Sequence, residues 1–264
     1  IFFAIKGKNI NGNNYINNAI HNGAKIIVSN LKFEGFDKNK ILFIHNKNPR
    51  KLLSKVASLF FKLKPSNIIG VTGTNGKTSI ANFYYQILNL NKKKVAAIGT
   101  LGVLSKKFSL KTNNTTLDPL NIHKILKKLK KFKIDNVILE ASSHGLKQYR
   151  LNNINFKTAL FTNLSRDHLD YHKTYSDYLN SKLILFNKLL NNKGNIIFDN
   201  KIPEAKHLKN ISKKRNLKTY IFGKSNSFIN ILNIKKINNK KKIDFLLNNK
   251  KYSFETSLIG KIQI

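Results

Sequence analysis

The residues best suited to chemistry form one short stretch, Gly70-Val71-Thr72-Gly73-Thr74-Asn75-Gly76-Lys77-Thr78-Ser79. Two internal glycines let the backbone turn its amides toward an anion, and the start of a following helix would add its dipole. Lys77 can reach the terminal phosphates of a nucleotide, and the Thr78 hydroxyl can hold Mg²⁺. Val71 stands where the usual spacing has its first glycine, so the stretch is a variant of a phosphate-binding loop. The alternative is an ordinary strand-to-helix turn, but the apolar residues before the stretch and the helical spacing after it favour the loop.

An acid and an imidazole each follow an apolar run that is typical of a buried strand. Glu140 comes directly after residues 137–139, and His168 lies a few positions beyond residues 159–161. Ligands bind beyond the carboxyl ends of parallel strands, so both side chains are expected near the loop. Glu140 could hold Mg²⁺ directly or through water, or it could be a carboxylate at a helix N-terminus. His168, with two acids and an arginine beside it, could be a ligand or a packed residue.

Lys182 falls within the apolar stripe of a helix expected over residues 175–190. An inward-facing lysine loses hydration, which lowers its pKa and frees a neutral amine. Such an amine could act as a base, or it could add CO₂ and become a carbamate that binds a metal. The alternative is a side chain that snorkels into water from the edge of the stripe. The stripe comprises Tyr178, Leu179, Leu185, Phe186 and Leu189.

A cluster of polar residues, Asn113-Asn114-Thr115-Thr116-Leu117-Asp118-Pro119, precedes another expected helix. Its hydroxyl and amide groups could hold a polar substrate. Asp118 followed by proline is also typical of a helix N-cap. The residues alone favour the cap.

Alternating apolar strands and amphipathic helices predict an α/β fold with a mainly parallel sheet. Pro65-Ser66 marks a boundary near residue 64, so we expect a small α/β domain over 1–64 and a second domain over 65–264. Residues 228–254 change to an alternating pattern, which predicts an antiparallel appendage. Further strands are expected at 1–5, 25–28, 41–44, 68–69, 95–99, 196–198 and 219–222, and further helices begin near 15, 49, 77 and 119.

Composition limits the class of protein. The chain of 264 residues has no cysteine, which excludes disulfides and thiolate metal sites. It has no apolar run of membrane-spanning length and no secretory signal pattern, so a cytoplasmic protein without membrane insertion is expected. The net charge of +37 could indicate nucleic-acid binding. Because the lysines are spread evenly among asparagines and isoleucines, compositional bias is the favoured explanation, with some salt-sensitive binding of polyanions in either case.

Four motifs, in this order, resemble those of the Mur ligases of peptidoglycan synthesis, and the resemblance covers essentially the whole chain. They are Gly-Val-Thr-Gly-Thr-Asn-Gly-Lys-Thr at 70–78, Asn-Thr-Thr at 114–116, Glu-Ala-Ser-Ser-His-Gly-Leu at 140–146 and Thr-Asn-Leu-Ser-Arg-Asp-His-Leu-Asp-Tyr-His at 162–172. Within the family they are most similar to the ligases that add the third residue of the peptide. The resemblance implies a central ATP-binding domain over 65–264 and a partial UDP-substrate domain over 1–64.

The resemblance also implies roles for individual residues. Catalysis would involve Lys77, Glu140, His168 and Lys182. Thr78 and Glu140 match ligands of one Mg²⁺, and His168 and Lys182 match those around a second, with Lys182 carboxylated on its amine. ATP would be bound by Gly73, Thr74, Asn75, Gly76, Lys77, Thr78 and Ser79, and the UDP-sugar-peptide by Asn114, Thr115, Thr116, Ser142, Gln148 and Arg150.

The reaction implied is amide formation through an acyl phosphate. ATP phosphorylates the D-glutamate γ-carboxylate of UDP-MurNAc-L-Ala-D-Glu, and the amine of a diamino acid, diaminopimelate or lysine, attacks it. The family further implies a monomer without a specific nucleic-acid partner. Two rivals stay open: a folylpolyglutamate-synthetase-like ligase, and a non-catalytic basic remnant that binds polyanions.

The chain departs from the family pattern at several places. Leu117 replaces the usual proline of Thr-Thr-Pro-Asp-Pro, and 198–200 matches the family's Asn-x-Asp-Asp poorly. The segment 258–264 resembles the start of a Leu-Ile-Gly-Lys-Phe-Asn motif. With no methionine at its start and no third domain after this motif, the chain is expected to be a fragment that holds the phosphate and metal site.

Overall fold

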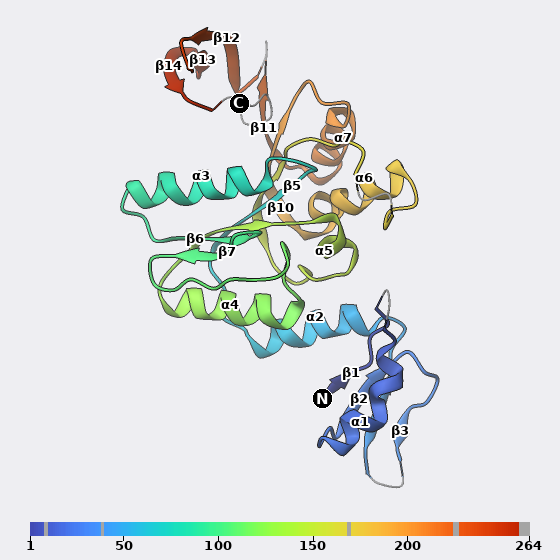
Figure 1. Cartoon of the computed structure of the whole chain (residues 1–264). Coiled ribbons are helices and arrows are strands. Elements are labelled where there is room, and N and C mark those ends of the chain that lie inside the picture. Colours follow the sequence, from blue (N-terminus) through green and yellow to red (C-terminus); the bar gives the residue numbers. More distant parts are fainter. Residues whose placement is uncertain (8–9, 38–39, 168–169, 224–226, 259–264) are drawn as a thin grey trace.

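The computed structural model describes residues 1–7, 10–37, 40–167, 170–223 and 227–258, which form two β-sheets with their helices (Figure 1). The first sheet has the strand order β1-β2-β4-β3, with β3 antiparallel to β4 and the other pairs parallel. Its small core contains Ala4, Ile16, Ile27 and Ile41. Its elements are β1 (Phe2–Phe3), the 3₁₀ helix η1 (Gly12–Tyr15), α1 (Ile16–His21), β2 (Ile26–Ser29), β3 (Gly35–Phe36) and β4 (Leu42–His45).

The second sheet has ten strands in the order β14-β13-β12-β11-β10-β9-β5-β8-β6-β7. The strands from β12 through β6 run parallel, whereas β7, β13 and β14 pair antiparallel with their neighbours. The strands are β5 (Asn67–Thr72), β6 (Val95–Gly99), β7 (Gly102–Ser105), β8 (Asn136–Glu140), β9 (Phe156–Phe161), β10 (Leu190–Asp199), β11 (Lys218–Gly223), β12 (Ile229–Ile237), β13 (Lys240–Leu247) and β14 (Lys250–Thr256).

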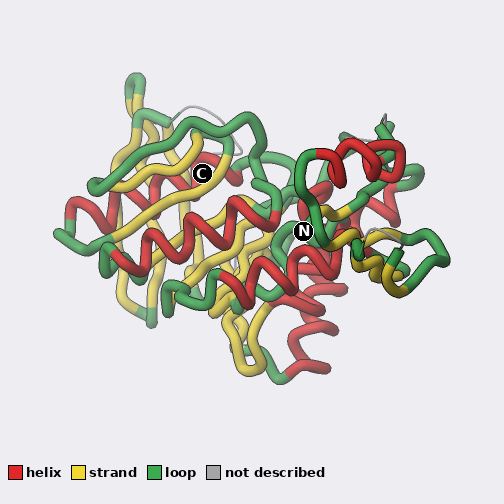
Figure 2. Tube along the Cα trace, turned by 90° about the horizontal axis from the view of Figure 1, so that it is seen from below, coloured by secondary structure: helices red, strands yellow, loops and turns green. Residues whose placement is uncertain are grey.

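Helices cover both faces of this sheet (Figures 1 and 2). The α3 face is packed by Val71, Ala81, Ala97 and Ile138, while residues of α4, α6 and α7 fill the larger core on the other face. Neighbouring residues of one strand face opposite ways, so each buried strand serves both cores. The helices are α2 (Pro49–Phe60), α3 (Lys77–Leu90), α4 (Pro119–Lys131), α5 (Ser143–Lys147), α6 (Tyr175–Ile184), the π-helical turn η2 (Leu185–Leu189) and α7 (Ala205–Arg215).

Local signals explain where several helices begin. The Asn48 and Asp118 side chains accept hydrogen bonds from Lys51 N and Asn121 N, and each is followed by a proline in the first helical position. The cap interpretation of Asp118 is therefore confirmed. Thr174 caps α6 by accepting from Asp177 N.

The structure confirms the α/β fold, its mainly parallel sheet and the antiparallel appendage. The helical spacing after the phosphate loop predicts one apolar face with Ile80, Phe83, Tyr84, Ile87 and Leu88, and this is only partly right. The α3 helix contacts the sheet through Ile80, Ala81 and Tyr84 and leaves Ile87 58% exposed. The helix expected over 175–190 changes to a π-helical turn after residue 184. The division of the chain at residue 64 into two functional domains stays a prediction. The motif at 258–264 lies almost wholly outside the described residues.

Candidate active site

The stretch between β5 and α3 is a tight loop braced by the end of β9. Gly76 begins α3 with a φ of 85°, and Gly73 has a φ of 144°, a region that side chains rarely adopt. A Cβ atom on Gly73 would lie 1.9 Å from the Thr162 hydroxyl. That hydroxyl donates to Asn75 O at 2.6 Å, and Thr74 N donates to Asn163 O at 2.9 Å. The loop therefore needs glycine at 73 both for its backbone and for its packing.

Two amines share one carbonyl oxygen of this loop. Lys77 Nζ donates to Gly73 O at 2.9 Å and to Thr74 O at 2.7 Å, and Lys182 Nζ donates to Gly73 O at 2.7 Å. Lys182 is only 1% exposed, so its inward placement is confirmed and snorkelling is wrong. Its Nζ atom also lies 4.4 Å from the centre of the Tyr178 ring. Without an anion, two neighbouring ammonium groups would repel each other.

Burial and repulsion together keep Lys182 easy to deprotonate. Burial, and after it the neighbouring charge of Lys77, lower the pKa of Lys182 to about 7, while Asp167 opposes both effects. Burial also lowers the pKa of Lys77, against the attraction of Glu140 and Asp167. Lys182 can therefore supply a neutral amine near neutral pH, as either a base or a carbamate would require.

Glu140 lies at the carboxyl end of β8 and reaches the start of α3. Its carboxylate accepts from the Thr78 hydroxyl at 2.9 Å, and from Thr100 N and the Thr100 hydroxyl at 2.9 and 3.1 Å. The side chain is 2% exposed. Glu140 does not cap the helix that follows it, because the Ser142 hydroxyl caps α5 by accepting from Gly145 N. The Glu140 carboxylate lies instead at the N-terminus of α3, which is compatible with both a metal ligand and a carboxylate at a helix N-terminus. The Glu140 carboxylate and the Thr78 hydroxyl thus form a pair of oxygen atoms that could bind a metal ion.

The residues matched to substrate binding lie beside Glu140, but some of their polar atoms are already used. The Thr116 hydroxyl donates to Glu140 O at 2.8 Å and accepts from Ser142 N at 3.0 Å, and Thr116 is 3% exposed. Thr115 Oγ1 is 3.0 Å from Thr100 Oγ1. Arg150 donates to Thr116 O at 2.7 Å. The Thr116 hydroxyl therefore holds this rim together and is not available to a ligand.

A cavity of about 170 Å³ brings three of the predicted substrate residues together, Asn114, Gln148 and Arg150. Arg50 of α2 lines the same cavity. The pKa of Arg150 is lowered, first by burial and then by the charge of Arg50. Asp118 also lines the cavity and opposes the effect of Arg50. Two guanidinium groups against one carboxylate leave a net positive charge, which suits an anion.

A larger cavity of about 680 Å³ opens beside the first turn of α3. Its walls combine apolar residues of α3 and the β12–β13 appendage with polar groups at the ends of β9 and β10. The apolar and aromatic residues include Ile80, Phe83, Leu160, Phe222, Ile231 and Ile234, and the polar ones include Ser79, Asn163, Asp199 and Lys241. Such a mixture suits a flat heterocycle next to a phosphate loop.

His168 lies outside the described residues. Within the described ranges, no cluster of three or more His, Asp or Glu side chains is arranged as a metal site, and no helix has the length and apolarity needed to cross a bilayer. Sequence reasoning missed the hydrogen bonds that Thr100, Thr162 and Tyr178 make with Glu140 and the loop. Thr100 could have been found, because it directly follows a predicted strand, at the edge where ligands bind.

Comparison with known proteins identifies the family. Residues 71–264 match the model of the Mur ligase middle domain. The chain is 39% identical over its whole length to the UDP-N-acetylmuramoyl-L-alanyl-D-glutamate–2,6-diaminopimelate ligase of Rickettsia montanensis, covering 55% of it. It is 41% identical to the ligase of the same name from Bradyrhizobium diazoefficiens over 72% of this chain and 39% of that protein. The chain thus spans about half the length of the curated relatives it matches.

Two solved structures with a similar fold come from the same family. A structure of a UDP-N-acetylmuramoyl-L-alanyl-D-glutamate–2,6-diaminopimelate ligase superimposes with a TM-score of 0.80 and 25% identity, over 94% of this chain and 51% of that one. The MurF ligase from Thermotoga maritima, solved with ADP, shares the fold with a TM-score of 0.61 and 19% identity, over 99% and 56% of the two chains. With the family model covering most of the sequence, the chain belongs to the Mur ligase family.

Proposed function

We propose that the chain is the nucleotide-binding part of an ATP-dependent ligase that adds a diamino acid to UDP-MurNAc-L-Ala-D-Glu. The observation that carries the proposal is the arrangement at the start of α3. There the glycine loop, Lys77, Thr78, Glu140 and the buried Lys182 converge. The relatives' printed names supply the substrate, with 2,6-diaminopimelate as the amino acid.

The triphosphate of ATP would bind along the loop, against its amides and the N-terminus of α3. Lys77 would leave the Gly73 and Thr74 carbonyls and bind the phosphate oxygens, whose negative charge attracts its ammonium group more strongly than a carbonyl does. The adenine would enter the cavity of about 680 Å³, between Phe83 and the β12–β13 appendage. This places both ends of the nucleotide on residues of this chain.

The residues present fit Mg²⁺, because the Thr78 hydroxyl and the Glu140 carboxylate are hard oxygen donors 2.9 Å apart at the phosphate loop. When bound there, Mg²⁺ would neutralise charge on the transferring phosphoryl group. Lys182, as a carbamate, would add an anion beside Lys77 and so replace repulsion with attraction. His168 is included as a metal ligand only because its motif resembles that of the family.

The acceptor substrate would lie across the rim formed by Ser142, Gln148 and Arg150, with its anionic groups near Arg50 and Arg150. The γ-carboxylate of its D-glutamate attacks the terminal phosphorus of ATP and ADP leaves. The amine of the diamino acid then attacks the acyl carbon, phosphate leaves, and an amide remains. The part played by this chain is to bind the phosphates and to hold the carboxylate in line with them.

The proposal includes residues 1–64 as part of the UDP-substrate domain and 65–264 as the ATP domain. We also propose that the protein is a monomer and works in the cytoplasm, where ATP and UDP-linked precursors are found. The four-stranded sheet β1-β2-β4-β3 and the ten-stranded sheet, each with its own core, support two domains.

Calorimetric titration with Mg-AMPPNP tests the proposal. Lys77→Ala should abolish measurable binding, because the variant loses the cation that faces the phosphates. Lys93→Ala, which removes the same charge from the exposed turn after α3, should bind as the unaltered chain does. Unchanged affinity in Lys77→Ala, with binding that collapses as salt rises, would instead support a basic protein that binds polyanions non-specifically.

A further inference from the structure

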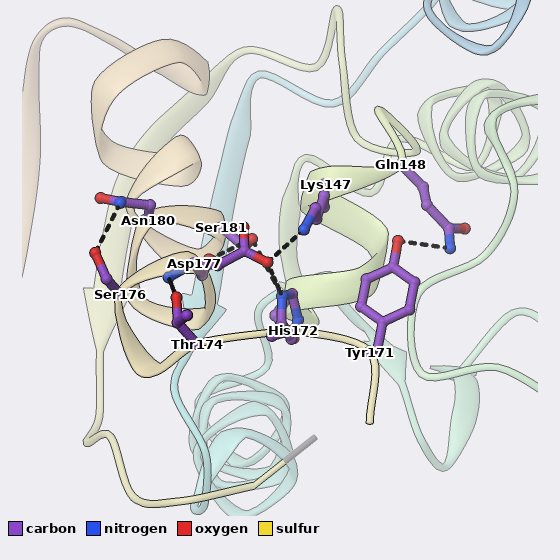
Figure 3. A network of polar contacts seen from close by, with 10 residues as sticks. Lys147, Gln148, Tyr171, His172, Thr174, Ser176, Asp177, Asn180 and Ser181 are labelled. Atoms are coloured by element: carbon purple, nitrogen blue, oxygen red, sulfur yellow. Dashed lines mark hydrogen bonds and ion pairs between the residues drawn. The ribbon is translucent and has the colours of Figure 1, made fainter. Parts of the chain in front are cut away.

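A buried histidine outside the phosphate loop bridges two helices of the site (Figure 3). His172 precedes α6, and its side chain has no exposed surface. Its Nε2 atom lies 2.9 Å from the hydroxyl of Ser143, the first residue of α5. Its Nδ1 atom lies 3.4 Å from the Ser181 hydroxyl and 3.5 Å from the Asp177 carboxylate, both on α6. One ring nitrogen therefore faces each helix.

The two helices lead to different parts of the site. On α6, the Tyr178 hydroxyl is 3.1 Å from Thr74 Oγ1 in the phosphate loop, and Lys182 donates to Gly73 O. The α5 helix runs from the Ser142 cap to Gln148, whose side chain accepts from Arg150. A shift of α6 would therefore disturb the nucleotide side, and a shift of α5 would disturb the side proposed for the UDP-sugar-dipeptide.

An ion pair beside His172 determines which of its ring nitrogens donates a hydrogen bond and which accepts one. Lys147 Nζ of α5 lies 2.5 Å from Asp177 Oδ2 and holds the pKa of that carboxyl below its ordinary value. A charged acceptor beside Nδ1 favours the tautomer with its proton on Nδ1. Nε2 is then the acceptor, and the Ser143 hydroxyl donates to it. Ser181 completes the link by donating to Asp177 O at 2.7 Å.

Ser143, His172 and Asp177 are arranged like the catalytic triad of a hydrolase, but the burial of the serine argues against a hydrolase. Ser143 is 1% exposed, so its hydroxyl cannot reach a substrate carbonyl. The same burial explains what the cluster can do. Buried hydrogen bonds between two helices hold them in one relative position, because breaking one leaves unpaired polar atoms.

We propose that His172 is a positioning residue of the ligase: its Nδ1 side holds α6 and the phosphate loop, and its Nε2 side holds α5 and the side chains for the UDP-sugar-dipeptide. The inference rests on the proposed function. It adds a residue that would touch neither ligand and yet affect the binding of each through a different nitrogen atom.

Two conservative variants test the contacts of the two ring nitrogens one at a time. The amide nitrogen of asparagine can take the place of Nδ1, and the amide oxygen of glutamine can take the place of Nε2. His172→Asn should keep the affinity for Mg-AMPPNP within about twofold and weaken binding of UDP-MurNAc-L-Ala-D-Glu about tenfold, the size expected for one buried hydrogen bond. His172→Gln should show the reverse. Calorimetry on the whole chain measures both affinities.

Serine variants repeat the test without altering the imidazole. Ser143→Ala should reproduce the pattern of His172→Asn, and Ser181→Ala that of His172→Gln. His123→Asn provides the matched control, because His123 is equally buried but lies on α4. It should change both affinities by less than about twofold.

The outcomes distinguish this inference from the proposed function. Equal losses for both ligands in all four variants, or a lower melting temperature with both affinities unchanged, would overturn the positioning role. If the unaltered chain bound neither ligand, the proposed function would fail, and this inference would fail with it.

Discussion

Gly99 offers a way to displace the Glu140 carboxylate without altering any residue that would touch the nucleotide. A Cβ atom at this last residue of β6 would lie 2.0 Å from Glu140 Oε1, 2.3 Å from Cδ and 2.5 Å from Cγ. Atoms in ordinary contact are about 3.5 Å apart. In Gly99→Ala the carboxylate must therefore move by about 1 Å or more, away from the donors on Thr78 and Thr100.

The size of the effect follows from the role proposed for Glu140. Disturbing a group that orients a bound metal costs about 10- to 100-fold in affinity, or about 1.4 to 2.7 kcal/mol. We expect the dissociation constant for AMPPNP to rise by this factor in Mg²⁺. In EDTA the two proteins should bind AMPPNP with similar affinity, because contacts with Lys77 and the loop amides do not involve the carboxylate.

Gly194→Ala is the matched control for steric crowding. Its Cβ atom would lie 2.8 Å from Asn191 O and 2.9 Å from Leu190 Cδ1, near the start of the paired part of β10. It should lower the melting temperature and leave both affinities unchanged. The reasoning would be refuted if folded Gly99→Ala bound Mg-AMPPNP as tightly as the unaltered chain, or lost equal affinity with and without Mg²⁺.

Three further predictions use residues outside the phosphate loop. Burial, and after it the charge of Lys64, lower the pKa of His123 to about 4, while the backbone of Asn152 offsets part of the lowering. Neither ring nitrogen has a well-aligned hydrogen-bond partner among the described residues. The unfolded chain therefore takes up a proton at His123 near pH 6.5, and the folded chain only near pH 4. The free energy of unfolding should accordingly fall by up to about 3 kcal/mol between pH 7 and pH 4. Urea denaturation should show that this free energy depends less on pH in His123→Asn, and the same pH dependence in both proteins would contradict the prediction. Tyr178→Phe loses the hydroxyl contact with Thr74 and should weaken Mg-AMPPNP binding about fivefold by calorimetry, whereas unchanged affinity would show that the contact does not hold the loop. Arg50→Ala removes one of two cations at the small cavity and should weaken UDP-MurNAc-L-Ala-D-Glu about tenfold without affecting Mg-AMPPNP; losses of equal size for both ligands would count against a separate anion site.

Local signals in the sequence were sufficient for the features that depend on one element. The helical period alone placed Lys182 inward, and the structure buries it. The strand-end position of Glu140 and the proline after Asp118 were likewise readable from neighbouring residues. The phosphate loop was recognisable because its glycines, its lysine and the helix after it occupy consecutive positions.

Features that join distant parts of the chain were not predictable in this way. The position of Thr100 at a strand end is readable from the sequence, but its contact with Glu140 depends on the pairing of β6 with β8, which no local pattern encodes. His172 ends the motif at 162–172, but no local pattern indicates its role, which depends on α5 and α6 lying side by side. The five-residue α5 and the lysine-rich α7 show too little apolar periodicity to be recognised. The exposure of Ile87 depends on how α3 is rotated against the sheet.

A crystal structure of the chain with Mg-AMPPNP and bicarbonate would test the central claim most directly. We expect the triphosphate against the amides of residues 73–79, Mg²⁺ on the oxygens of Thr78 and Glu140, and a carbamate on the amine of Lys182. A nucleotide bound elsewhere, or bound at the loop with Glu140 still paired only to Thr78 and Thr100, would contradict it.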